Sequence, residues 1–148
     1  MGTYGYISII AMLCYGFMLL MFLTAKRNKI IDSFLVVLTG LLFWTGGSAF
    51  MRAQLWPGCE FWYQVSLLGI LLLPYAYYCF ILAFGGVKKS LPGKIYLAVM
   101  LICFVVNIRH GVFLGCPNVV EKNGLPTFVY EIKPTILVLF FPAGIFLI

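Results

Sequence analysis

The chain of 148 residues is 64% hydrophobic and only 9% charged, with a mean hydropathy of +1.08. Soluble domains carry about 25% charged residues, so this chain has too few to cover a surface that faces water. Its net charge of +6 is confined to short segments between apolar runs, which is typical of membrane-protein loops and not of a nucleic-acid-binding surface. We therefore predict an all-α protein in the lipid bilayer, a multi-pass protein of the cell membrane.

Five apolar runs predict a bundle of about five transmembrane helices in one domain. A helix needs about 20 apolar residues to cross the hydrocarbon core of about 30 Å. The fifth run has only 14 residues and would rise about 21 Å, so we expect a fragment whose last helix is incomplete. The predicted spans cover residues 4–24, 30–51, 61–84, 95–114 and 135–148.

The second run begins near a carboxylate and has many small residues. We expect Asp32 to pair with Lys29 or to cap the start of this helix. Small side chains let helix backbones approach closely in lipid, which predicts tight packing along one side of the helix. These small residues are Gly40, Gly46, Gly47, Ser48 and Ala49.

The third run carries clear signals along its length. Trp62 and Tyr63 lie at its start, where amphipathic rings favour the headgroup layer. Pro74 lies near its middle and lacks the N–H of a helical hydrogen bond, so we expect a helix kink there. Gly85 and Gly86 end the run.

Lysine and arginine are unevenly distributed between the two sides of the predicted bundle. Cytoplasmic loops of membrane proteins carry an excess of these residues. We therefore expect the turns after the first and third spans to be cytoplasmic and the N-terminus to be outside. The basic residues of these turns are Lys26, Arg27, Lys29, Lys88, Lys89 and Lys94.

The longer loop between the fourth and fifth spans contains two short β-prone runs. Asn123-Gly124 lies between them and is a strong signal for a tight turn. Pro126 weakens the start of the second run. We expect a small outer β-hairpin between these helices.

Two of the five cysteines, Cys59 and Cys116, fall in predicted outer loops. A disulfide there would join the third and fourth spans, and two free thiols are the alternative. The other cysteines lie inside spans, where apolar packing is their expected role. The cysteine and histidine spacing fits no zinc motif, and we expect no metal and no cofactor.

Several polar and aromatic residues gather near the predicted outer ends of the spans. Ionisable residues at membrane depth indicate function, although residues at the interface can simply be solvated. Aromatic walls with a few donors are typical of small-molecule sites. We find no catalytic residue set. The candidate ligand-binding residues are Arg52, Trp56, Gln64, Asn107, Arg109 and His110.

In order and spacing, a series of residues resembles the N-terminal seven-transmembrane sensor region of bacterial histidine kinases. The series continues through Asn107 and His110, spaced three apart, to an outer hairpin and a fifth helix. By this resemblance we expect two further helices and an output domain to follow the fifth helix in the longer protein. The matching residues in the second and third spans are Phe43-Trp44, Phe61-Trp62, Leu68-Gly69-Ile70, Leu73-Pro74, Phe80, Leu82, Phe84 and Gly85-Gly86.

The resemblance implies a receptor module with no enzyme activity in this chain. An unknown outer ligand or a membrane state would bias the helix bundle and so control a cytoplasmic effector. A homodimer is one candidate assembly, because kinase sensors commonly work as dimers, but the sequence itself does not specify the oligomeric state. The alternative is a fragment of a transporter or channel, against which the nearly uncharged midplane counts. A membrane-embedded enzyme is the third hypothesis for the function of this chain.

Overall fold

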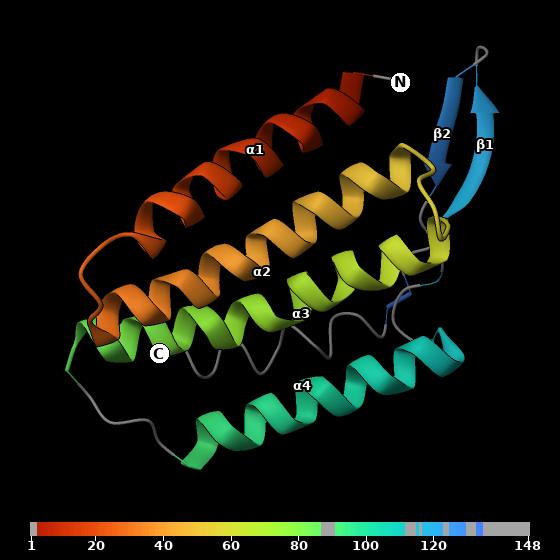
Figure 1. Ribbon diagram of the computed structural model, residues 1–148. Coiled ribbons are helices and arrows are strands. Elements are labelled where there is room, and N and C mark those ends of the chain that lie inside the picture. The colour runs from red at the N-terminus through yellow and green to blue at the C-terminus, as the bar shows by residue number, and fades with distance from the viewer. Residues whose placement is uncertain are drawn as a thin grey trace.

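The computed structural model describes residues 3–86, 91–111, 115, 117–122, 125–129 and 133–134. Within them, consecutive helices lie side by side in chain order and run antiparallel (Figure 1). The elements are α1 (Thr3–Leu23), α2 (Lys29–Arg52), α3 (Cys59–Phe84) and α4 (Leu91–His110), followed by β1 (Asn118–Lys122) and β2 (Leu125–Val129).

Three of the described helices, α1, α2 and α3, are long and apolar enough to cross a membrane. The apolar part of α4, Gly93–Ile108, is shorter. The predicted fifth span lies outside the described residues, so the count of about five spans stays a prediction. Helix α3 continues through Pro74 as one helix, and the bend expected there also stays a prediction.

Helix α4 begins and ends before the predicted limits of 95–114. It ends where Gly111 adopts a φ of 55°, the left-handed conformation in which glycine commonly closes a helix. The N–H of Gly111 donates to the carbonyl of Asn107 at 2.8 Å. Helices α1, α2 and α3 begin and end close to their predicted limits.

The start of α2 differs from the prediction for Asp32. Asn28 is the capping residue, and its side chain accepts a hydrogen bond from the Ile31 N–H at 2.7 Å. Asp32 pairs with Arg27 at 2.8 Å, so the expectation that it pairs with Lys29 or caps the helix is wrong. Both side chains of the pair are more than half exposed, and the pair therefore adds little stability.

Helices α2 and α3 pack backbone against backbone. A Cβ atom added at Gly47 would lie 2.6 Å from the Ser66 nitrogen, and one at Gly69 would lie 2.5 Å from the Trp44 nitrogen. Only glycine permits so close an approach at these two positions. The small residues of α2 do not share one side, because Gly46 lies against Met12 of α1 while Gly47 lies against α3.

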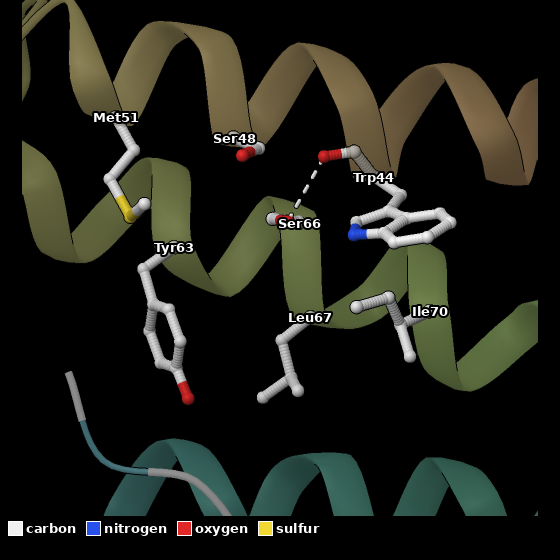
Figure 2. A pocket seen from close by; sticks show the side chains of 7 residues that line it. All are labelled: Trp44, Ser48, Met51, Tyr63, Ser66, Leu67 and Ile70. Atoms are coloured by element: carbon white, nitrogen blue, oxygen red, sulfur yellow. Dashed lines mark hydrogen bonds between the residues drawn. The ribbon is translucent and has the colours of Figure 1, made fainter. Parts of the chain in front are cut away.

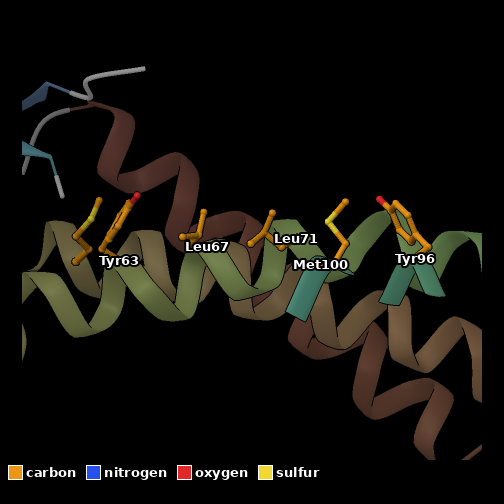
Figure 3. Close-up of a cluster of buried hydrophobic side chains, with 6 residues drawn as sticks. Tyr63, Leu67, Leu71, Tyr96 and Met100 are labelled. Carbon is orange, nitrogen blue, oxygen red and sulfur yellow. The ribbon is translucent and has the colours of Figure 1, made fainter. Parts of the chain in front are cut away.

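Helices α3 and α4 pack through large side chains. A cluster of buried residues fills this side of the bundle, and Figure 3 shows most of its members extending from the two helices. Its members are Met51, Tyr63, Leu67, Leu71, Tyr96 and Met100. Two of them, Tyr96 and Met100, are only 5% and 2% exposed and are the contribution of α4.

Strands β1 and β2 pair antiparallel, with Val119 opposite Phe128. The side chain of Phe128 packs against the buried cluster, so the strand pair is attached to the bundle. Lys133 adds a second attachment, because its Nζ donates to the Gly111 carbonyl at 2.7 Å. The predicted turn residues 123–124 lie outside the described residues, and an outer position for the strands stays a prediction.

Candidate functional site

A cavity of about 110 Å³ lies between α2 and α3. It is next to the close backbone contact at Gly47, near the end of the bundle where α2 ends and α3 begins (Figures 1 and 2). Three lining residues come from α2 and four from α3. They are Trp44, Ser48 and Met51, and Tyr63, Ser66, Leu67 and Ile70.

The hydroxyl groups of Ser48 and Ser66 make one side of the cavity polar. The Ser66 hydroxyl donates to the Trp44 carbonyl at 3.0 Å and so links the two helices (Figure 2). Among the seven side chains drawn there, the Ser48 hydroxyl takes part in no hydrogen bond and lies beside the Ser66 side chain. The cavity therefore offers a donor and an acceptor within a lining that is mainly apolar.

The other walls are mainly apolar, with polar atoms at the Trp44 indole nitrogen and the Tyr63 hydroxyl (Figure 2). The indole of Trp44 lies next to Ile70, while Tyr63 and Leu67 extend toward α4 (Figure 2). None of the seven lining residues is charged. This arrangement suits a neutral ligand, because an unpaired charge is costly to move out of water into such surroundings.

Two of the predicted ligand-binding residues adjoin the cavity in sequence. Arg52 follows Met51, and Gln64 follows Tyr63. Both are half-buried, and the Arg52 Nε and Gln64 Oε1 atoms are buried without a hydrogen-bond partner. A buried polar atom without a partner costs about 1–3 kcal/mol, so an additional partner at either atom would stabilise this end of the bundle.

Two further predicted ligand-binding residues, Trp56 and Asn107, are not among the residues that line the cavity. Trp56 is 90% exposed, whereas Asn107 is only 2% exposed near the end of α4. The side chains of Arg109 and His110 lie outside the described residues. A single ligand site made of these residues and Arg52 and Gln64 therefore stays a prediction.

Cys59 is half-buried and packs against the buried cluster as a free thiol. Cys116 lies outside the described residues, so the predicted disulfide between the two stays a prediction. The described residues contain no group of three or more histidine, cysteine or acidic side chains that could hold a metal ion.

A sequence model of the N-terminal 7TM region of histidine kinase matches residues 7–148. The chain belongs to this family. No curated protein and no solved structure gives a significant match to the chain. The family match covers all four described helices except the first residues of α1, as well as both strands.

As a histidine kinase 7TM region, the chain is a membrane sensor region that acts in signalling. The three long apolar helices agree with a location in the membrane. The resemblance stated from the sequence is thus confirmed for the family. A sensor region binds a ligand or responds to a signal and does not carry out the kinase reaction. Its function therefore depends on pockets and on contacts between helices.

Sequence reasoning missed most of the cavity in this 7TM region. It assigned no site role to Ser48 or to the indole of Trp44. A signal was present, because Ser48 and Ser66 are hydroxyl residues within long apolar runs. Polar side chains at such positions commonly hydrogen-bond across helices. Which two of them face each other depends on the rotation of both helices, which periodicity did not reveal.

Proposed function

We propose that this chain is the sensor region of a bacterial histidine kinase that passes an outer or intramembrane signal to a cytoplasmic output domain. The family match supports the kinase class. The observation that carries the proposal is the cavity beside the glycine contact of α2 and α3. A void at a tight helix contact changes its shape whenever the two helices shift.

The proposed mechanism is a shift between two arrangements of α2 and α3. A ligand shifts such an equilibrium only as far as its affinities for the two arrangements differ. The Ser66–Trp44 hydrogen bond and the Gly47 contact hold the close arrangement. A ligand that fits the cavity only when the helices separate slightly would favour the other arrangement, and the change would reach the ends of both helices.

We further propose a multi-pass topology in the cell membrane with the N-terminus outside. The end of α1, the start of α2, the end of α3 and the start of α4 lie together at one end of the bundle (Figure 1). Lys26, Arg27 and Lys94 belong to these regions, which supports a cytoplasmic side there. Reporter fusions after Lys29 and Lys89 should give cytoplasmic signals, and a fusion after Asn123 should not. The reverse pattern contradicts this orientation.

The signalling proposal is tested on the full-length product of the gene in native membranes. Incubation with radiolabelled ATP should label a histidine of that product. The Gly47→Ala variant should change the rate of labelling about fivefold or more, because it disturbs the α2–α3 contact.

A product that is not phosphorylated contradicts the proposal. Flux of ions or solutes through proteoliposomes that contain it would favour the alternative, a transporter or channel. An unchanged rate in a folded Gly47→Ala variant contradicts the proposed role of the α2–α3 contact.

A further inference from the structure

We propose that the cavity between α2 and α3 is a binding site for a short aliphatic alcohol of about five heavy atoms, with its hydroxyl at Ser48 and Ser66. The binding itself does not depend on any signalling activity. Its use as a signal rests on the proposed function.

The size of the cavity sets the size of the ligand. An engineered apolar cavity of about 150 Å³ holds benzene, which has six carbon atoms. The cavity here, at about 110 Å³, therefore holds a somewhat smaller molecule, of about five heavy atoms. A straight-chain butanol has this size, and its flexible chain can follow the space between Trp44 and Ile70.

The distribution of polar atoms selects an alcohol over water. A buried water makes about three hydrogen bonds, and the cavity volume corresponds to about three or four waters at about 30 Å³ each. The lining offers four polar side-chain groups, the hydroxyls of Ser48, Ser66 and Tyr63 and the indole N–H of Trp44, which are fewer than three or four waters would need. The remaining walls, which include Leu67, Ile70 and the Met51 side chain, suit an alkyl chain.

The same walls select against charged ligands and against plain hydrocarbons. A charge would find no partner, because no lining residue is charged. A hydrocarbon would leave the Ser48 hydroxyl without a ligand partner, and Ser48 is drawn with no hydrogen bond to the other lining residues (Figure 2). A hydroxyl can both donate to Ser48 and accept from it.

Access to the cavity is from the membrane side. Trp44 forms one wall and is 42% exposed, so this wall borders the outside of the described bundle. Short alcohols dissolve in the bilayer and reach such a position without crossing the helix contact. An occupant would lie beside the Ser66–Trp44 hydrogen bond and would oppose the closest approach of α2 and α3.

The test uses the whole chain in lipid nanodiscs and a diazirine derivative of butanol as the photolabel. After illumination, mass spectrometry should find the adduct on the lining residues Met51 or Tyr63, and an excess of 1-butanol should suppress it. The Ser48→Leu variant fills the cavity and should lower this labelling about fivefold or more. Val36→Leu is the matched control, because Val36 is on the same helix, 54% exposed, and not among the lining residues.

A second variant keeps the test decisive where Ser48→Leu fails to fold. Ser48→Ala leaves room for the ligand and removes one hydroxyl. It should raise the concentration of 1-butanol needed to suppress labelling about fivefold, the usual contribution of one hydrogen bond, and should not weaken suppression by pentane. Labelling confined to exposed residues, or equal labelling of Ser48→Leu and the parent chain, would overturn the proposal. Neither result bears on phosphorylation of the full-length product, so the two proposals fail separately.

Discussion

The two faces of α3 are packed in opposite ways. Toward α2, its backbone touches the neighbouring backbone at Gly47 and Gly69, and the Ser66 hydroxyl links the helices. Toward α4, it presents Tyr63, Leu67 and Leu71 to large side chains. The first contact has a fixed distance set by backbone atoms, whereas the second is made by side chains that can change rotamers.

The difference indicates where movement between helices has a large cost and where it is easily absorbed. A backbone contact loses its fit with any shift, so it has discrete close and separated arrangements. A contact made through Met100 and Tyr96 can adjust gradually, because methionine is flexible and fills irregular space. The cavity lies at the first kind of contact, which is the one suited to a switch.

The largest expected effect comes from Gly47→Ala. The new Cβ would lie 2.6 Å from the Ser66 nitrogen and 2.8 Å from the Trp62 carbonyl oxygen, both backbone atoms that cannot move aside. We expect a loss of about 2–3 kcal/mol in the free energy of unfolding. The measurement is an SDS titration of the chain in mixed micelles, followed by circular dichroism.

Gly46→Ala is the control for this prediction. Its Cβ would meet the Met12 side chain, with the sulfur at 3.5 Å and Cγ at 3.8 Å, which is an ordinary contact with a flexible side chain. It should be neutral or stabilise the chain by less than about 1 kcal/mol through helix propensity. Equal losses for the two neighbouring variants would show that α2 and α3 do not touch at Gly47.

The next effect is expected at the α3–α4 contact. Met100→Ala removes a side chain that is 2% exposed and leaves a void beside Leu71 and Tyr96. Because lipid replaces water outside the bundle, we expect a loss of about 1.5 kcal/mol, below the range of about 2–5 kcal/mol seen in soluble cores. The same SDS titration measures it. Val105→Ala, at a position 62% exposed, should change stability little, and a larger loss there would reverse the assignment of the two faces of α4.

The smallest effect is expected from Ser66→Ala. It removes the hydroxyl that donates to the Trp44 carbonyl and leaves the glycine contacts in place. Hydrogen bonds between membrane helices average about 0.6 kcal/mol, and we expect a loss of that size in the SDS titration. Thr45→Val is the comparison, since Thr45 donates only to Leu41 of its own helix. A loss above that of Met100→Ala would mean that the hydroxyl, rather than the glycines, holds α2 to α3.

Much of this architecture followed from the residues. The charged turn around Lys26 and Arg27 and the Trp56–Gly58 loop set the limits of α1, α2 and the start of α3, because charges and turn residues interrupt apolar runs sharply. The predicted end of α4 was wrong, because the apolar run continues past Gly111 whereas the helix ends before this glycine. Hydropathy reports how well a segment suits lipid. It does not detect a glycine that ends a helix by adopting the left-handed conformation.

The site was harder to predict than the helices. The small residues of α2 correctly indicated close packing, but not that Gly46 and Gly47 serve different neighbours. The predicted residues Arg52 and Gln64 lie at the edge of the cavity. Its centre is at Ser48 and Trp44, and they face it because of how each helix is rotated about its axis. That rotation is decided by contacts between distant residues, which a local pattern does not contain.

The side chain of Trp62 connects the α2–α3 loop to α3. Its indole N–H is shared between the carbonyls of Leu55 and Trp56, at 3.2 and 3.3 Å, and its ring packs edge-on against Phe50. Rotation of α3 about its long axis would move this indole N–H away from both carbonyl acceptors at once. Such a rotation would therefore require the segment that joins α3 to α2 to detach from the Trp62 indole first.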